Sequence, residues 1–173
     1  MSKLTNALVP SVQRLIEALQ VKVITYSELV QDSELFHEFG SIPDCMQGCY
    51  HPVLDMIVVK DEHLCNSTEI VLHEIIHWAG AESRLNRKWV TDSKAIMMGT
   101  ASQETLDSFN DDRDTEEATA EIGMLKLVLV LGLNPAQQAD SALDYLEGLL
   151  DIDMVKADKD SDKAVEYWLV FWE

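Results

Sequence analysis

The feature that most constrains this chain is an apolar run over residues 68–80, which contains the pattern His73-Glu74-x-x-His77. Residues four apart lie on one face of a helix, so His73 and His77 can point at the same ion. Glu74 lies beside that ion and off its axis, where a base must sit to take a proton from water. Chance would produce this pattern roughly 0.01 times in a chain of this composition. The run therefore predicts a metal-binding helix.

The length and composition indicate one globular domain. The chain has 173 residues, of which 47% are hydrophobic and 25% charged, and this is enough to build a single hydrophobic core. It contains only 7 Gly and 4 Pro, so we expect many helices and few elaborate turns. No repeat or linker divides the sequence, and residues 1–173 are interpreted as one domain.

The formal charge of −18 limits the partners that the chain can bind. It disfavours direct binding to nucleic acid, because no basic patch is available to contact phosphates. Two interpretations remain. The commoner one is an acidic, self-repelling surface that favours solubility, and the sharper one is a polyanion that imitates DNA and occupies a DNA-binding protein.

The cysteines and the absence of targeting signals favour the cytoplasm. Cys45 and Cys49 are spaced like half of a metal site, but no second pair is present and Cys65 is a poor complement. We find no signal peptide and no run of 18 or more apolar residues. We therefore expect a cytoplasmic protein with reduced thiols and no membrane span.

Hydrophobic periodicity predicts a helix-rich α+β fold with a small, mostly antiparallel sheet. Spacing and end signals predict helices over residues 4–20, 27–39, 67–79, 116–131 and 136–150. β-Branched runs predict strands over residues 21–26, 49–52 and 54–59. Pro52 and the polar break after it favour an edge hairpin for the last two strands.

Three segments show no clear periodicity. Residues 81–115 are polar and turn-like at 110–114, and Trp89 favours an ordered loop over a linker. Residues 151–163 are acidic and are predicted to be irregular. The apolar, aromatic segment 165–172 is expected to dock on the body of the protein.

Zinc needs a third protein ligand and an open position for water. Glu117 and Glu121 lie four residues apart, and the small Ala118 and Ala120 would let two helices approach closely. One carboxylate facing the histidines would complete a His₂Glu set, and the other could accept the second ring N–H of a ligand histidine. Glu116 is interpreted as a charge that favours the start of a helix.

The other ionisable residues are weighed in the same way. An acidic residue on the apolar part of a buried helix is costly unless it is paired, which favours the bracing role for Glu121. The remaining histidines have no ligand spacing and are interpreted as surface or packing residues; they are His37, His51 and His63.

Several motifs in matching order carry a resemblance to a known family. They are Tyr50-x-Pro52-x-x-Asp55-x-Ile57, His73-Glu74-Ile75-Ile76-His77-Trp78, Ser83-Arg84-Leu85-Asn86-Arg87 and Glu116-Glu117-Ala118-Thr119-Ala120-Glu121-Ile122-Gly123. Together they resemble the zincin-like metallopeptidase domain of ArdC-type antirestriction proteins, and the similarity covers about residues 48–132.

The resemblance implies a zincin-like fold and one Zn²⁺. It is similar to the gluzincin pattern, which implies that Glu117 binds zinc and that Glu121 braces a ligand histidine. It also implies a strand that aligns peptide substrates beside the cleft, here residues 54–59 with Asp55 and Ile57. ArdC-type proteins carry an N-terminal DNA-binding segment, but only about 50 residues precede the matching region here, so that role is not transferred.

Three hypotheses follow for the function. The first is a zinc metallopeptidase of phage or mobile-element type, with Glu74 as the base, a protein or peptide substrate, and a role in counter-defence against a host defence protein. The second is a non-catalytic acidic antirestriction or inhibitor protein that imitates DNA and holds a structural zinc. The third is a helical protein with a fortuitous motif, which the Glu117 and Glu121 pair argues against. The stretch 88–114 matches nothing in the family, and we expect it to shape or cover the cleft.

Overall fold

The computed structural model describes residues 3–150 and 152–171. It is 66% helical with a small three-stranded mixed sheet, so the predicted helix-rich α+β class is confirmed. The helices are α1 (Lys3–Ala7), α2 (Pro10–Leu19), α3 (Tyr26–Gln31), α4 (Ser33–Phe39), α5 (Ser67–Ala79), α6 (Lys88–Met97), α7 (Gln103–Val130), α8 (Ala136–Glu147) and α9 (Met154–Leu169), with a 3₁₀ helix at Asp61–Asn66. The strands are β1 (Lys22–Thr25), β2 (Gly48–His51) and β3 (Met56–Val59).

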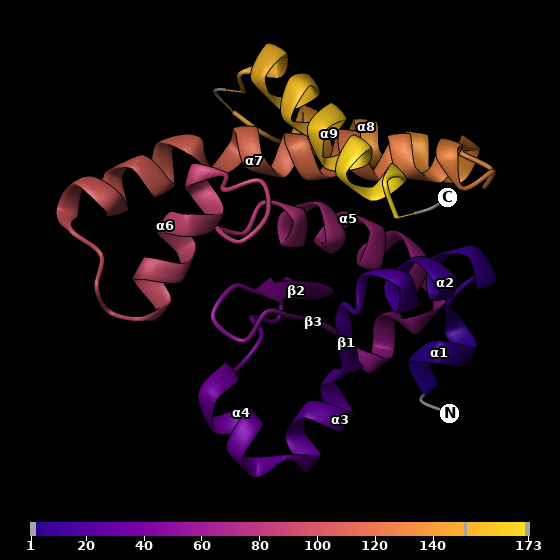
Figure 1. The fold of residues 1–173 in the computed structure, drawn as a ribbon, viewed down its shortest axis with the longest axis horizontal. Coiled ribbons are helices and arrows are strands. Elements are labelled where there is room, and N and C mark those ends of the chain that lie inside the picture. Colours follow the sequence, from indigo (N-terminus) through magenta and orange to yellow (C-terminus); the bar gives the residue numbers. More distant parts are fainter. Residues whose placement is uncertain (1–2, 151, 172–173) are drawn as a thin grey trace.

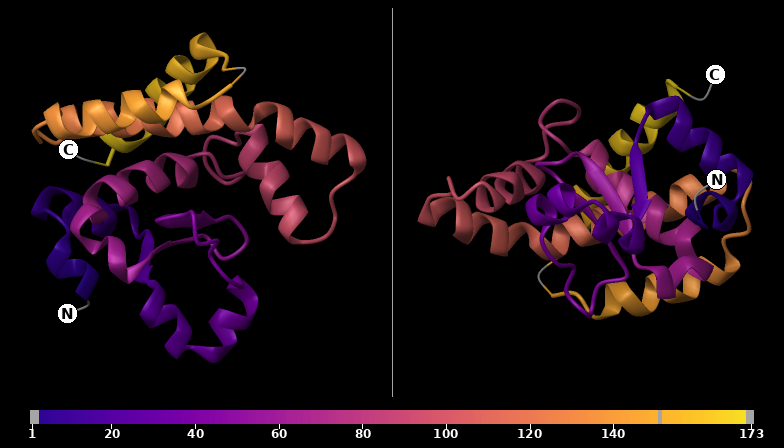
Figure 2. Two further views of the ribbon diagram at one scale, coloured as in Figure 1. Left: turned by 180° about the vertical axis from the view of Figure 1, so that it is seen from behind. Right: turned by 90° about the horizontal axis from the view of Figure 1, so that it is seen from below.

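The elements form layers around α5. Figure 1 shows α7, α8 and α9 on one side of α5 and the sheet on the other, with α3 and α4 beyond the sheet. The reverse view in Figure 2 shows the same order. The larger apolar core joins α5 to the sheet, α7 and α9, and a smaller one lies between the sheet and the α3–α4 segment. Helix α5 is therefore held on two sides.

The predicted hairpin of the last two strands is present, but β3 lies at the centre of the order β1-β3-β2 rather than at an edge. The sheet is mixed rather than mostly antiparallel. Strand β3 pairs with β1 in parallel and with β2 in antiparallel orientation. Ile57 and Val59 pack in the larger core and Met56 and Val58 in the smaller one, so β3 is buried on both faces. A strand that is buried on both faces has a continuous run of apolar residues in its sequence. Pro52 lies in the turn after β2, where it disturbs no ladder.

The N-terminal helices are shorter than the sequence predicted. The expected helix over 4–20 is two helices, because Pro10 occupies the first turn of α2 and cannot continue α1. The expected helix over 27–39 is also two, and Asp32 caps the second of them. Thr25 caps α3 and forms a capping box with Glu28, so this helix begins at Tyr26, one residue earlier than predicted.

The predicted loop over 81–115 is wrong, because it contains α6 and the first half of α7. Ser102 caps α7, and the helix runs without a break through the acidic residues 110–114. The Trp89 ring of α6 stacks on the Phe109 ring at a centroid distance of 4.7 Å, and the indole N–H donates to the Phe109 carbonyl. This contact between the helices outweighs the local turn preference of the Asp-rich run.

Helices α5 and α7 pack closely where the site is formed. Ala118 and Ala120 are fully buried, in agreement with the prediction that these small residues let two helices approach closely. The tightest point is Gly123, where an added Cβ would lie 2.8 Å from Ile76 side-chain carbons. The small residues on α7 thus bring its glutamates within reach of the α5 histidines.

The acidic C-terminal region is helical rather than irregular. Asp153 caps α9 through the Lys156 amide, and Lys126 of α7 binds the carboxylates of Asp158 and Asp162. The predicted docking of the last apolar segment is seen at Trp168, which is buried in the larger core. The predicted segments also included Asp151 and Trp172, which lie outside the described residues. No described helix is long and apolar enough to cross a membrane.

Candidate metal centre

His73 and His77 lie one turn apart on α5 and face the same point. Their Nε2 atoms are 3.3 Å apart, and the rings are nearly perpendicular at 71°. The rest of α5 is fixed by buried aliphatic residues, including Leu72, Ile75 and Ile76. The histidine face is therefore held against α7 by packing on the other sides of the helix.

Glu117 supplies a third donor from α7. Its Oε2 atom lies 3.5 Å from His73 Nε2, and its Oε1 atom lies 3.9 Å from His77 Nε2. One ligand atom from each of the three residues fits within a 4.8 Å cluster. The structure thus brings together the three residues that the sequence proposed as metal ligands.

The outer ring nitrogens of both histidines contact carboxylates. His73 Nδ1 lies 2.9 Å from Glu121 Oε2, and His77 Nδ1 lies 3.0 Å from Glu116 Oε1. A carboxylate at Nδ1 favours a proton there, which leaves Nε2 with a free lone pair. Two bare Nε2 atoms at 3.3 Å would repel each other, so either a proton or a metal ion is favoured between them.

Glu116 corrects the sequence interpretation, which treated it as a helix-start charge. It is only 2% exposed, and its Oε1 atom also lies 3.0 Å from Arg87 Nη2. Arg87 donates in addition to the Ile76 carbonyl of α5. Since α7 begins at Gln103 rather than near Thr115, Glu116 lies within the helix and joins His77 to a buried guanidinium.

The charges of the centre favour a cation. Burial lowers the pKa of His73, but hydrogen bonds with Glu117 and Glu121 outweigh it and hold the pKa well above its usual value. Burial raises the pKa of Glu117, but the hydrogen bond from His73 and the neighbouring imidazoles bring that pKa down to about 2. The ionised carboxylates thus stabilise the protonated form of His73, and a metal ion at Nε2 would take the place of that proton.

Glu74 does not belong to the cluster of His73, His77 and Glu117, and its carboxylate is bound to the sheet. Its Oε2 atom accepts a hydrogen bond from the Tyr50 amide at 2.7 Å. Tyr50 lies in β2, opposite Ile57 of β3, and its amide points away from β3 toward α5. A carboxylate has about four lone-pair sites on its two oxygens, so the second oxygen of Glu74 stays available for another proton donor.

Tyr145 of α8 also reaches the centre, although no local sequence pattern pointed to it. Its hydroxyl donates to Glu117 Oε2 at 2.9 Å, and its ring meets the His73 ring edge-on at 6.4 Å. The residue is 44% exposed. Burial and the Glu117 carboxylate raise the pKa of the phenol, so the hydroxyl remains a proton donor.

The predicted substrate-edge residues do not form an edge. Ile57 is fully buried in the central strand β3. Asp55 lies in the β2–β3 turn with a φ of 50°, where its carboxylate binds the Arg84 guanidinium and accepts from the Tyr50 hydroxyl. The sheet edge beside Glu74 belongs to β2, one strand away from the one that the sequence indicated.

The other histidines and the cysteines lie apart from this cluster. His51 is buried against Phe39 and accepts from the Leu54 amide, which is a packing role. All three cysteines are free. Burial and the nearby Glu74 carboxylate raise the pKa of the Cys49 thiol to about 12, so it remains protonated near neutral pH.

The chemistry of the centre follows from its donor set. Two imidazoles, each with a carboxylate at its Nδ1 atom, converge with the carboxylate of Glu117, and Glu74 lies to one side. Comparison with protein-family models, with curated proteins and with solved structures found no match to this chain.

Proposed function

We propose that this chain is a zinc-dependent metallopeptidase with a zincin-like domain. In this proposal His73, His77 and Glu117 hold one Zn²⁺, and Glu74 acts as the general base. The observation that carries it is the convergence of these three donors while both outer ring nitrogens are occupied by carboxylates. If the motif had arisen by chance, its histidines would not be expected to contact three glutamates of another helix, here Glu116, Glu117 and Glu121.

The donor set fits zinc better than a hard cation. Calcium and magnesium prefer oxygen ligands, whereas two imidazoles and one carboxylate are typical of catalytic zinc. Zn–N bonds of 2.0–2.1 Å in a tetrahedral arrangement place two ligand nitrogens about 3.3 Å apart. The two Nε2 atoms lie at 3.3 Å. Three protein ligands leave a position for water.

The reaction is hydrolysis of a peptide bond, with the residues in distinct roles. Bound zinc supplies Lewis acidity, which lowers the pKa of water and polarises the scissile carbonyl. The free oxygen of Glu74 takes a proton as the water oxygen bonds to the carbonyl carbon, and it passes that proton to the amine as the C–N bond breaks. The Tyr50 amide orients Glu74 during both transfers.

Two further groups support this assignment. The Tyr145 hydroxyl is a half-exposed donor at Glu117, and we assign it to the negative charge that develops on the carbonyl oxygen. Strand β2 lies at the edge of the sheet next to Glu74. Apart from the Tyr50 N–H, which Glu74 occupies, the outward backbone groups of this edge could pair with an extended peptide and bring its carbonyl over α5.

Metal analysis and a cleavage search test the proposal together. The purified protein should contain one zinc per chain, and so should its Glu74→Gln variant. Proteome-wide analysis of new termini should find cuts made by the wild type and none by Glu74→Gln. A purified protein without zinc would refute the proposal.

A second candidate function is favoured by the charge of −18. An acidic protein with the same fold and a structural zinc could inhibit a host restriction enzyme by imitating DNA, without hydrolysis. The two candidates differ in one measurement. Antirestriction that persists in Glu74→Gln indicates mimicry, and antirestriction that is lost with zinc content unchanged indicates proteolysis in counter-defence.

A further inference from the structure

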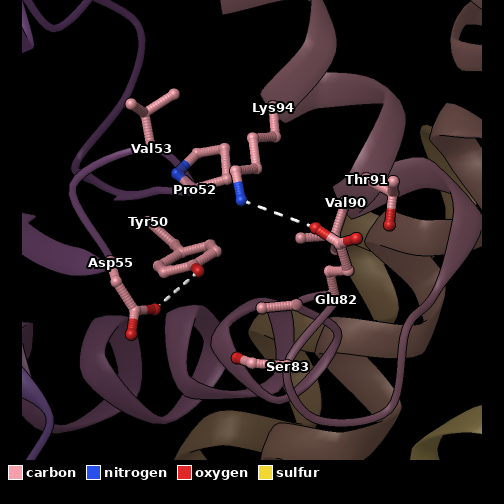
Figure 3. Close-up of a pocket in the computed structure, with 10 residues that line it drawn as sticks. Tyr50, Pro52, Val53, Asp55, Glu82, Ser83, Val90, Thr91 and Lys94 are labelled. Carbon is pink, nitrogen blue, oxygen red and sulfur yellow. Dashed lines mark hydrogen bonds and ion pairs between the residues drawn. The ribbon is translucent and has the colours of Figure 1, made fainter.

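A pocket of about 330 Å³ lies beside the metal centre. It is an open pocket between the β2–β3 turn, the segment that follows α5, and α6 (Figure 3). Its apolar walls are the ring of Tyr50 and the side chains of Pro52, Val53, Ala81 and Val90. None of the metal ligands lines it, so the pocket is a separate feature of the surface.

Two residue pairs connect this pocket to the centre. Tyr50 donates its backbone N–H to Glu74 while its side chain lines the pocket. Val90 lines the pocket, and the ring of its neighbour Trp89 packs against His77 at a centroid distance of 5.5 Å. The pocket lining therefore includes, or directly follows in sequence, the residues that contact Glu74 and His77.

The charged side chains around the pocket neutralise one another. Asp55 is bound by both terminal nitrogens of Arg84, and the Tyr50 hydroxyl also donates to it at 2.8 Å. Lys94 forms an ion pair with Glu82 at 3.6 Å, which is drawn as a dashed line in Figure 3. Since each charge has its partner, the pocket offers no unpaired charge to a ligand, and its apolar walls decide what it accepts.

We propose that this pocket is a specificity subsite that accepts one aliphatic or aromatic side chain of the polypeptide cleaved at Glu74. The inference rests on the proposed peptidase function. A volume of about 330 Å³ is at the lower limit for ligand pockets, which run from roughly 300 to 1,000 Å³. It suits one large side chain better than a cofactor. A charged side chain would lose its hydration without gaining a partner.

The test is the side-chain preference of the zinc-loaded enzyme. Cleavage of a peptide library made from digested proteome should show, at one fixed position relative to the cut, about tenfold or greater enrichment of Leu, Ile, Met and Phe over Asp and Lys. Ser83, which is exposed and lines the pocket, provides a position to fill it. Ser83→Trp should lower kcat/KM for Leu-containing peptides about tenfold and leave peptides with Gly at that position unchanged.

Two control variants separate filling from other effects. Ser83→Ala keeps the pocket open, and Ser41→Trp adds the same ring at an exposed residue outside the lining; both should keep the wild-type preference. Cleavage that depends on Glu74 but shows no apolar preference, or a preference that Ser83→Trp leaves intact, overturns the subsite alone. Absence of any cleavage that depends on Glu74 overturns the peptidase function and the subsite with it.

Discussion

At the scale of residues, the centre uses four glutamates in different ways. Glu117 faces the Nε2 atoms, Glu121 and Glu116 hold the two Nδ1 atoms, and Glu74 is held by a backbone amide. Side chains at neighbouring positions of a helix point about 100° apart. Glu116 therefore contacts an Nδ1 atom while the adjacent Glu117 faces the Nε2 atoms. The orientation of each imidazole thus depends on a carboxylate at its Nδ1 atom, on the side of the ring away from the other histidine.

Glu121→Gln should weaken zinc binding about 10–100-fold, because an amide holds the His73 tautomer less firmly than a carboxylate does. The fold should be unaffected, since Gln has nearly the same shape. Competition with a chromogenic chelator measures the change in affinity. An affinity equal to that of the wild type would show that the contact between Glu121 and His73 does not tune the metal.

Glu116→Ala should instead lower the free energy of unfolding, by about 3–5 kcal/mol, because it leaves a buried guanidinium without its partner. Arg87 is 8% exposed and bound to Glu116. Urea denaturation measures this loss, and Glu116→Gln, which keeps the hydrogen-bond acceptor, should lose less. Equal stability of Glu116→Ala and the wild type would contradict the role of this ion pair.

Tyr145→Phe should keep zinc and lower kcat about 10²–10³-fold with little change in KM, as expected for a group that acts only on developing charge. The ring still packs beside His73 in this variant, so the removal is confined to the hydroxyl. Steady-state kinetics with metal analysis distinguishes the outcomes. Loss of zinc with no separate effect on kcat would mean that Tyr145 only positions Glu117.

Sequence spacing could identify some of these residues and not others. The i and i+4 spacings of His73 with His77 and of Glu117 with Glu121 are local, so they are visible before any fold is known. Glu116 was misinterpreted because its role depends on Arg87, which only the connection between α5 and α6 brings close. Tyr145 comes from a helix whose placement no local pattern specifies.

At the scale of elements, prediction succeeded where one local signal decided the structure. The bounds of α5 follow from its apolar run and Gly80. Ser102 is a local signal for the start of α7, but the continuation of the helix through the turn-like run depends on the stacking between Trp89 and Phe109. The central position of β3 depends on its parallel pairing with β1 across a long connection.

The closeness of α5 and α7 yields a prediction at this scale. Gly→Ala in a helix normally stabilises a protein by about 0.5–1 kcal/mol, but Gly123→Ala should destabilise it by about 1–3 kcal/mol, because the new Cβ meets Ile76. It should also weaken zinc binding by moving Glu117 away from the histidines. Thermal unfolding and chelator competition measure both effects.

A double-mutant cycle provides the control for Gly123. In an Ile76→Ala background the obstructing side-chain carbons are absent, so Gly123→Ala should cost less there than in the wild type. Equal costs in both backgrounds would show that the contact between Gly123 and Ile76 does not set the distance between the helices.

At the scale of the whole molecule, the metal centre and the hydrophobic cores are separate. The larger core joins α5 to the sheet, α7 and α9 through apolar side chains, and the smaller core lies beyond the sheet. The few Gly and Pro residues and the short β-branched runs were enough to predict the α+β class. The layer order was not predictable, because it depends on contacts between segments far apart in the sequence.

This separation predicts that chelation weakens the protein without unfolding it. A metal at about 1,000 times its Kd contributes roughly 4 kcal/mol to stability, and each kcal/mol shifts Tm by about 2–4 °C in a domain of this size. EDTA should therefore lower Tm by about 8–16 °C while far-UV circular dichroism at 25 °C keeps its helical signal. The loss should reverse when zinc is restored. Unfolding at 25 °C on chelation would mean that zinc holds the fold together, which would favour a structural metal in a binding protein over a catalytic one.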